Sequence, residues 1–295
     1  MSQNDVIREE SMEDLWNVWY SELHHGRAGL TLKVKQVVYS GQSPFQRIDI
    51  LDTYEFGKIL VLYGSIMITE KDEYIYHEMI SHVPLFTHPH PRQVLVVGGG
   101  DGGTIREVMK HPQVERATLV EIDQMVVEKS KEHFPDVACE LTNPRTRILF
   151  EDGARFVAET EEKFDIILAD SPDPVGPGEV LFQKKFHQDI YDRLNEDGIF
   201  VAQSESPWWH QRTLRRMYEN ISSIFPIVRL YWAYIPTYPS GSWSFILGSK
   251  KYDPLQDFKA DQYAKLNIET NYYNEGIHQA AFALPNFIKQ AVFNR

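Results

Sequence analysis

The stretch QVLVVGGGDGG, residues 93–103, decides the fold. Its first five residues form a short apolar, β-branched run that is typical of a buried parallel strand, and glycines follow at once. The glycines from Gly98 onward have the G-x-G-x-x-G spacing, and residues 104–110 continue with apolar side chains at helical spacing. This order of strand, glycine turn and helix predicts a nucleoside-binding α/β unit. The alternative is a tight turn that needs glycine only for steric reasons.

Two acids belong to this unit. Glu121 closes the next apolar run about twenty residues downstream, where nucleotide-binding units place an acid on ribose hydroxyls. Asp101 lies inside the turn, where the free N–H groups at the start of a helix favour an anion. A carboxylate at that place repels a pyrophosphate or a carboxylate and attracts an ammonium group. Asp101 is alternatively the N-cap of the helix, an interpretation that is compatible with the first.

The composition excludes several classes of partner. Among 295 residues, 42 are acidic and 30 are basic, and the net charge of −12 disfavours nucleic acids and favours a small cation. The single cysteine, Cys139, excludes an internal disulfide framework. Residues 1–16 are mostly polar and charged, and no apolar run approaches the roughly 18 to 20 residues that span a bilayer. We therefore predict a cytoplasmic protein with no membrane partner.

The residues before the glycine turn predict a separate small domain. Strand patterns begin at Leu30 and continue through 46–52, 58–62 and 66–68. The last two strands pair across a turn at residues 63–65. A helix over 73–86 ends before the HisProHisPro of 88–91, because proline stops helices and restricts the residue before it. We predict a β-rich N-terminal domain with a bridging helix in residues 1–87 and a catalytic domain in residues 88–295.

From Gln93 onward strands and helices alternate, which predicts an α/β fold with a mostly parallel sheet and helices on both faces. The expected strands are 116–121, 146–151, 164–170, 198–203, 228–235 and 243–249, and the expected helices are 123–133, a short one from Ala154, 183–194 and 208–224. The last two strands suggest an antiparallel finish. Parallel strands end at one edge of a sheet, and ligands bind beyond that edge. We therefore expect the strand-end polar residues to face one crevice: Asp101, Glu121, Asp152, Asp170 and Gln203.

The strand over 164–170 leads into the loop DSPDP, residues 170–174. Asp170 and Asp173 stand three residues apart on a stiff, proline-containing loop, which suits a cation or a general base. Mg²⁺ or Ca²⁺ could use such a pair, but no Cys or His cluster stands at ligand spacing, so we predict no metal. A solvated turn is the other interpretation, since Asp and Pro both favour turns.

Six motifs in order resemble the polyamine aminopropyltransferases, the family of the spermidine synthases. They are GGGDGG, YHEM at 76–79, VEID at 120–123, DSPDP at 170–174, PVGP at 174–177 and TYPSG at 237–241. The resemblance runs from about Trp19 to Phe287. It implies a small β domain before a Rossmann-like, methyltransferase-type domain. It also implies transfer of an aminopropyl group from decarboxylated S-adenosylmethionine to a diamine, commonly putrescine, giving spermidine and methylthioadenosine. The donor is a co-substrate, no cofactor is bound permanently, and relatives assemble as homodimers or homotetramers.

The resemblance also implies roles for individual residues. Asp170 is the proton acceptor. The donor contacts Gln46, Asp101, Glu121, Asp152, Gly153 and Pro177. The acceptor amine and the aminopropyl chain contact Tyr76, His77, Asp101, Asp170, Ser171, Pro172, Asp173, Gln203 and Tyr238. These roles agree with the acid in the glycine turn, because the decarboxylated donor has lost the carboxylate that Asp101 would repel and keeps an ammonium group.

Several points stay open at the level of sequence. Pro172 stands where the family commonly has Ser or Thr, so the choice among putrescine, cadaverine and agmatine is not fixed. A free diamine is mostly protonated at neutral pH, and no pattern shows how a neutral nitrogen is presented. The aromatic residues of the last third line the amine's alkyl chain or belong to the core: Trp208, Trp209, Tyr238 and Trp243. The segment 174–183 suggests a lid. A methyltransferase of the same sheet architecture and a non-catalytic nucleoside-binding protein remain as alternatives.

Overall fold

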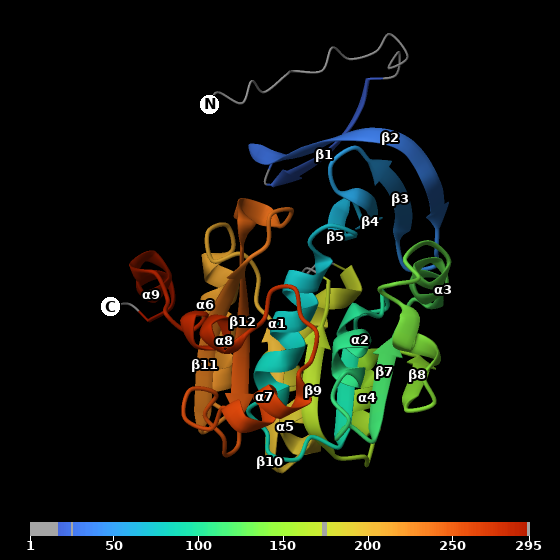
Figure 1. Cartoon of the computed structure of the whole chain (residues 1–295). Helices are drawn as coiled ribbons and strands as arrows, with labels where there is room; N and C mark the ends of the chain where they lie inside the picture. Colours follow the sequence, from blue (N-terminus) through green and yellow to red (C-terminus); the bar gives the residue numbers. More distant parts are fainter. Residues whose placement is uncertain (1–16, 25, 173–175, 294–295) are drawn as a thin grey trace, which may run out of the picture.

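The computed structural model describes residues 17–24, 26–172 and 176–293. They form two β-sheets, and the small sheet lies over one end of the large sheet (Figure 1). The small sheet is antiparallel in the order β1-β2-β3-β4-β5. Its strands are β1 (Val18–His24), β2 (Ala28–Gln42), β3 (Arg47–Thr53), β4 (Gly57–Leu62) and β5 (Ser65–Thr69).

The alternation in the third strand decides which face of the small sheet is buried. Ile48 and Ile50 are fully buried, as the polar–apolar pattern predicts for a half-buried strand. The turn between β4 and β5 consists of Tyr63 and Gly64, and both have a positive φ, of 55° and 85°. Two-residue hairpins favour this backbone because its twist matches that of the strands. The predicted hairpin is thereby confirmed.

The large sheet has the order β11-β12-β10-β9-β6-β7-β8. Its strands are β6 (Gln93–Gly98), β7 (Arg116–Glu121), β8 (Thr146–Phe150), β9 (Phe164–Asp170), β10 (Leu194–Gln203), β11 (Ile227–Tyr234) and β12 (Ser242–Ser249). β12 pairs antiparallel with both its neighbours, whereas β8, β7, β6, β9 and β10 run parallel. The Rossmann-like sheet and its antiparallel finish are therefore confirmed. The order of the strands reverses between β6 and β9, where ligands bind in open α/β sheets.

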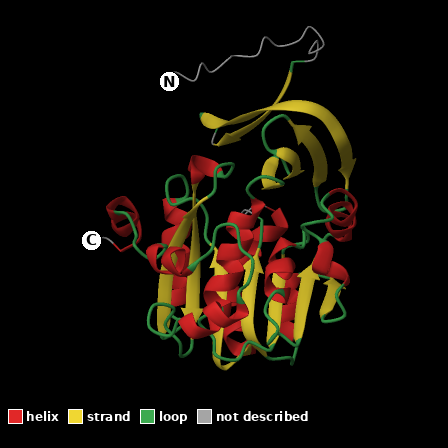
Figure 2. Cartoon of the chain, viewed as in Figure 1, coloured by secondary structure: helices red, strands yellow, loops and turns green. Residues whose placement is uncertain are grey.

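Helices cover both faces of the large sheet, as predicted (Figure 2). One face packs against α1 (Glu73–Leu85), α2 (Gly103–Met109), α7 (Ala260–Leu266) and α8 (Glu275–Ala280). The other packs against α4 (Gly153–Glu159), α5 (Lys184–Arg193), α6 (Gln211–Ser222) and α9 (Asn286–Phe293). The helix α3 (Gln124–His133) contributes Val126 to a cluster with the small sheet. Three short 3₁₀ helices complete the fold: η1 (Cys139–Thr142), η2 (Gly176–Phe182) and η3 (Pro239–Gly241).

Two boundaries differ from the prediction by three residues or more. The strand expected from residue 198 begins at Leu194, which pairs with Phe164 before an irregularity in the register. The helix expected from residue 208 begins at Gln211, because the backbone N–H groups of Trp208 and Trp209 donate to Ser206 Oγ and hold a turn there. Capping of backbone groups by a serine competes with a helix in this way.

The chain's last forty residues carry little pattern, and buried contacts to α1 hold them in place. The Glu78 carboxylate accepts hydrogen bonds from the backbone N–H groups of residues 271, 272 and 273 at 2.7, 2.8 and 2.7 Å. The Tyr231 hydroxyl donates to Met79 O at 3.0 Å. α1 therefore packs on the large sheet, and the domain boundary at residue 88 stays a prediction. None of the helices within the described ranges has the length and apolar character needed to cross a membrane.

Hydrogen bonds also join the connection between β11 and β12 to β5 and to the residues just before α1. The Tyr238 hydroxyl donates to Met67 O at 2.7 Å. The Asp72 carboxylate accepts from the backbone N–H and the hydroxyl of Thr237 at 3.0 and 2.7 Å. The two sheets are thus connected close to the reversal point of the large sheet.

Candidate active site

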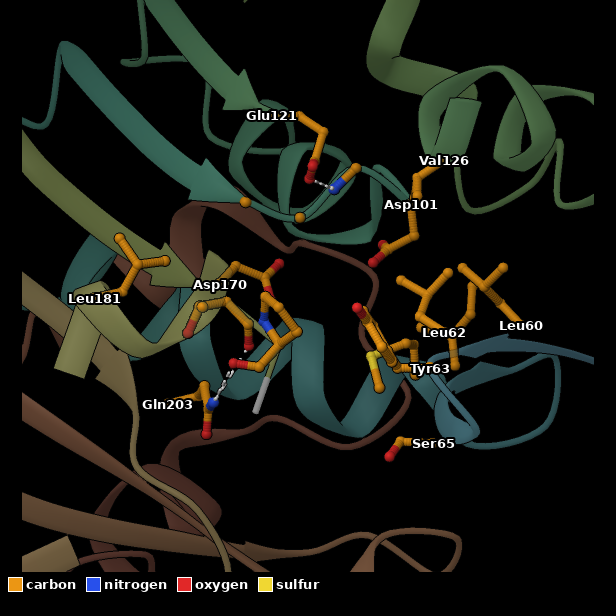
Figure 3. Close-up of a pocket in the computed structure, with 18 of the residues that line it drawn as sticks. Leu60, Leu62, Tyr63, Ser65, Asp101, Glu121, Val126, Asp170, Leu181 and Gln203 are labelled. Atoms are coloured by element: carbon orange, nitrogen blue, oxygen red, sulfur yellow. Dashed lines mark hydrogen bonds between the residues drawn. The ribbon is translucent and has the colours of Figure 1, made fainter. Parts of the chain in front are cut away.

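A pocket lies at the reversal point, between the carboxyl ends of the large sheet's strands and the small sheet (Figure 3). The five strand-end residues that the sequence places in one crevice all line it: Asp101, Glu121, Asp152, Asp170 and Gln203. So do other predicted site residues, namely Gln46, Tyr76, His77, Gly153, Ser171, Pro172 and Tyr238. Asp173 lies outside the described residues, and Pro177 falls in η2. Leu60 and Leu62 of the small sheet face the acids from the opposite side in Figure 3.

The glycine turn brings the backbone against Asp170. Gly99 has a φ of 72°, and a Cβ there would lie 2.6 Å from Asp170 Oδ2. Only glycine fits such a position without strain. The turn therefore serves the close approach of two chain segments that end neighbouring parallel strands.

Asp170 is held at both of its carboxylate oxygens. Tyr76 donates its hydroxyl to Oδ1 at 2.7 Å, and Thr104 donates its hydroxyl to Oδ2 at 2.6 Å. Burial first, and the nearby negative charge of Asp101 second, raise the pKa of Asp170 to about 6. The carboxylate is thus oriented and more basic than a solvated aspartate, which suits a proton acceptor near neutral pH.

Asp101 contacts both the glycine turn and α1. Its Oδ1 accepts from Gly103 N at 2.7 Å and lies 3.2 Å from His77 Nε2. Gly102, with a left-handed φ of 92°, is the N-cap of α2, so the N-cap interpretation of Asp101 is wrong by one residue. Burial opposes ionisation of Asp101, but the charge of His77 and its hydrogen bond outweigh burial and lower the pKa of Asp101. Asp101 is therefore a carboxylate.

His77 belongs to a buried ionic network that the sequence did not reveal. Its Nδ1 lies 2.5 Å from Glu73 Oε2, one helical turn earlier in α1. Arg106 of α2 donates twice to the Glu73 carboxylate, at 2.9 and 2.9 Å. Burial would lower the pKa of His77, but Asp101 and Glu73 outweigh burial and raise it to about 10. The i, i+4 spacing of Glu73 and His77 indicates their contact in the sequence. The contact of Glu73 with Arg106, 33 residues away, has no such local signal.

His77, Asp101 and Asp170 bring three potential metal ligands within 4.8 Å of one another. Both ring nitrogens of His77 face carboxylates, which only accept hydrogen bonds, so both nitrogens carry protons. A doubly protonated imidazole has no lone pair for a metal. This donor set therefore does not fit a metal ion, and the predicted absence of a metal stays a prediction.

The acids at the ends of β7 and β8 are oriented by the backbone. Glu121 accepts from Gly100 N at 3.2 Å and from Asp123 N at 2.9 Å, and burial raises its pKa to about 7. Asp152 caps α4 by accepting from the N–H groups of residues 154 and 155. Gln46, in the loop between β2 and β3, donates to Asp123 Oδ2 at 3.0 Å, so it joins the pocket from the side of the small sheet.

The pocket wall also contains a carboxylate that no sequence motif indicated. Glu22 of β1 is 6% exposed, lines the pocket and accepts from Ile66 N at 2.7 Å. Burial raises its pKa to about 7. Glu22 stands in an ordinary strand pattern, and only the folded sheet brings it to the pocket.

Gln203 donates its amide to Ser171 O at 3.2 Å and supports the acidic loop.

The aromatic residues of the last third divide into two groups. Tyr238 and Trp243 line the pocket. Trp208 is 57% exposed and packs edge-on against Phe287. Like Trp209, it is absent from the pocket wall formed by the described residues. In η2, Gly178 and Leu181 line the pocket, so part of the segment predicted as a lid borders the site.

The chain is similar to known proteins along most of its length. Residues 73–260 match the family model of the spermine/spermidine synthase domain, and residues 18–70 match that of the spermidine synthase tetramerisation domain. A polyamine aminopropyltransferase of Caldicellulosiruptor saccharolyticus is 49% identical over 275 residues, covering 93% of this chain and 98% of the relative. One of Shouchella clausii is 49% identical over 271 residues, covering 92% and 98%.

Solved structures agree. A crystal structure of spermidine synthase in complex with the transition state analogue AdoDATO matches with a TM-score of 0.93 and 44% identity, covering 98% of this chain and 99% of that one. Spermidine synthase of Thermotoga maritima matches with a TM-score of 0.90 and 43% identity, covering 97% and 98%. Fold, pocket and relatives together define an enzyme of the Rossmann-like transferase class. The chain belongs to the polyamine aminopropyltransferase family.

Proposed function

We propose that the protein transfers the aminopropyl group of decarboxylated S-adenosylmethionine to a diamine, most readily putrescine, giving spermidine and methylthioadenosine. One observation carries the proposal: two buried carboxylates, Asp101 and Asp170, stand within 4.8 Å of each other beside the glycine turn. One holds the donor's ammonium group and the other accepts a proton. A methyltransferase that binds S-adenosylmethionine would place the substrate's carboxylate against Asp101, which is repulsive.

The donor's nucleoside occupies the side of the pocket formed by the glycine turn. Glu121 accepts hydrogen bonds from the ribose hydroxyls, and Asp152 and Gly153 contact the adenine edge. Gln46 and Pro177 complete this side. The family resemblance supports these roles, and so do the positions of Gln46, Glu121, Asp152 and Gly153 in the pocket wall. The donor acts as a co-substrate rather than a permanently bound cofactor.

The reaction is a direct displacement. The acceptor nitrogen attacks the propyl carbon bonded to the donor's sulfonium, a C–N bond forms, and the C–S bond breaks with its electron pair going to sulfur. The nitrogen becomes acidic as the new bond forms, and Asp170 accepts its proton. Tyr76 and Thr104 fix both oxygens of Asp170. The Asp170 carboxylate therefore needs no reorientation before it accepts the proton.

The acceptor occupies the other part of the pocket. Its reacting end lies by Tyr76, His77 and Asp170, and the chain passes the remaining predicted contacts: Ser171, Pro172, Asp173, Gln203 and Tyr238. Glu22 offers a buried carboxylate for the far ammonium group. Several carboxylates in one pocket wall suit a molecule with two amines.

We also propose that the chain assembles as a homodimer or homotetramer. The match to a tetramerisation domain supports this, and so do large apolar side chains exposed on β1 and β2: Val18, Trp19, Leu23 and Val37. Light scattering of the purified protein would give the mass directly, and a monomer would contradict the proposal.

Mass spectrometry of the products tests the function. The enzyme is given decarboxylated S-adenosylmethionine with putrescine, cadaverine, agmatine and spermidine in competition. We expect methylthioadenosine and spermidine as the main products. As a control, Asp170→Asn should still bind the donor while its turnover falls by roughly 10² to 10⁴-fold. Methylated products from S-adenosylmethionine, with no aminopropyl transfer, would favour the methyltransferase instead.

A further inference from the structure

We propose that His77 is a fixed cation that makes the bound acceptor amine less basic, so that the diamine nitrogen can attack in its neutral form. This inference rests on the proposed function, and it addresses a requirement that the sequence leaves unexplained. An amine with a solution pKa near about 10 is neutral in only about one molecule per thousand at pH 7. The site therefore gains from any group that favours the neutral form.

The charge of His77 follows from its geometry. The side chain is 1% exposed, and its two ring nitrogens face Glu73 Oε2 at 2.5 Å and Asp101 Oδ1 at 3.2 Å. Carboxylates accept hydrogen bonds and do not donate them, so the ring satisfies both partners only when both nitrogens are protonated. A Cβ on Gly103 would lie 2.3 Å from the ring, so α2 packs directly against the imidazolium.

A second layer of charges keeps Glu73 ionised. Arg106 binds Glu73 through two nitrogens and donates through Nε to Glu107 at 2.8 Å. The fully buried Glu107 carboxylate is also met by His82 Nε2 at 3.0 Å and by Lys110 Nζ at 2.7 Å. Because Arg106 balances the charge of Glu73, the positive charge of His77 is not cancelled on that side.

The cation lies close to the reacting nitrogen. Donor atoms of His77, Asp101 and Asp170 all fall within 4.8 Å of one another. A nitrogen that passes its proton to Asp170 sits about 3 Å from that carboxylate. The nitrogen then lies within about 8 Å of the imidazolium, and at that separation in a partly buried site repulsion between two unit charges favours the neutral amine by a factor of roughly 10 to 100.

The charges that face this nitrogen act in opposite directions. Asp170 favours the ammonium form until it takes the proton, and Tyr76 beside it is uncharged. Asp101 is shared between His77 and, in the proposed complex, the donor's ammonium group. The donor's sulfonium adds a further positive charge. With the donor bound, three positive groups, namely His77 and the donor's ammonium and sulfonium, face the two carboxylates of Asp101 and Asp170.

The test is the pH dependence of turnover in His77→Gln, at saturating donor and acceptor. Glutamine retains an N–H donor for one carboxylate and removes the charge. We expect the rate at pH 7 to fall by roughly 10 to 100-fold and to return to within about threefold of the unsubstituted enzyme near about pH 10. An equal loss at every pH would overturn the proposal, because that is the result of a merely structural defect.

A second acceptor separates the amine from Asp170, whose own pKa also depends on His77. A diamine fluorinated next to the reacting nitrogen is much less basic. If His77 acts on the amine, this acceptor should largely restore the rate of His77→Gln at pH 7. If the defect is the same with both diamines, His77 acts only on Asp170 and the proposal is wrong.

His82→Gln is the matched control. His82 lies in the same helix, is fully buried and bonds a carboxylate, Glu107, but it is not part of the pocket wall. We expect it to lower stability and to leave the pH profile of turnover in place. Nitrogen NMR of the His77 ring in the unliganded protein gives a readout besides activity: an imidazolium at pH 8 is expected, and a neutral ring overturns the proposal. Absence of aminopropyl transfer by the unsubstituted enzyme would instead refute the proposed function, and this inference with it.

Discussion

Asp101 is the residue that we expect to decide donor selectivity. Its carboxylate is buried against the glycine turn and is ionised beside His77. In Asp101→Asn we expect decarboxylated S-adenosylmethionine to bind roughly 10 to 100-fold more weakly, because a charge-assisted hydrogen bond is lost. Binding of S-adenosylmethionine should improve, since its carboxylate is no longer repelled. Isothermal titration with both ligands measures the ratio.

The matched control for this prediction is Asp136→Asn, a change in an exposed carboxylate outside the pocket wall. It should leave both affinities in place. Equal affinities of the unsubstituted enzyme for the two ligands would remove Asp101 from its proposed role.

We expect Thr104 to affect catalysis through the ionisation of Asp170. Its hydroxyl donates to Asp170 Oδ2 at 2.6 Å and thereby favours the carboxylate form. Asp170 must be ionised to accept a proton, so the rate should fall as the pH drops through its pKa of about 6. In Thr104→Val we expect the pH of half-maximal rate to move up by roughly 0.5 to 1.

This shift is best measured with a weakly basic acceptor, so that protonation of the amine does not limit the rate. Thr118→Val provides a control, because Thr118 is equally buried in β7 but lies outside the pocket wall. An unmoved profile in Thr104→Val would mean that Asp170 does not titrate in the rate-limiting step.

At the scale of elements, α1 and α2 pack closely against each other in the site. This contact depends on Gly103, where a Cβ would meet the His77 ring at 2.3 Å. We expect Gly103→Ala to destabilise the protein by about 1 to 3 kcal/mol, because a closely packed ring must move. Displacement of His77 from Asp101 should also reduce turnover. Denaturant unfolding and steady-state kinetics measure the two effects.

Gly276→Ala is the comparison, since it lies on the exposed side of the short helix α8. There an alanine should be neutral or slightly stabilising, because glycine is a poor helix former. Similar losses in both variants would show that the contact with His77 has no special importance.

Elements with a strong periodic pattern were predictable from the sequence. β6, β7 and β9 are short apolar runs, and their ends place Asp101, Glu121 and Asp170 together once the sheet is parallel. α1 was predictable as a helix, but the charged residues it buries were not. Glu73 finds Arg106 across 33 residues, and Glu78 holds backbone groups 193 to 195 residues away. No local pattern encodes such long-range pairs.

At the scale of the whole molecule, the ionised form of the buried Glu22 in the pocket lowers the free energy of unfolding. Glu22 has a pKa raised to about 7 by burial, whereas in an unfolded chain it titrates near about 4.3. Below both values it is neutral in each state and costs nothing. As the pH rises from about 4 to 7 the unfolded state ionises first, so stability falls, and above 7 the full cost is present.

Glu22→Gln should therefore stabilise the unliganded protein at pH 8 by on the order of 1 to 3 kcal/mol and have little effect at pH 4. The same variant should bind the diamine more weakly. Thermal unfolding at both pH values, with the exposed Glu161→Gln as control, tests the sign. A loss of stability at pH 8 would contradict it.

The hydrogen bonds from Thr237 and Tyr238 to Asp72 and Met67 have a consequence for how the enzyme responds to its ligands. They hold the two walls of the pocket together, and we expect a nucleoside bound there to contact both sheets. Its affinity then opposes any fluctuation that draws the small sheet away from the large one. We expect cleavage of the backbone between the two sheets by a protease to slow in proportion to ligand occupancy. The lifetime of the enzyme would then depend on the supply of its substrate.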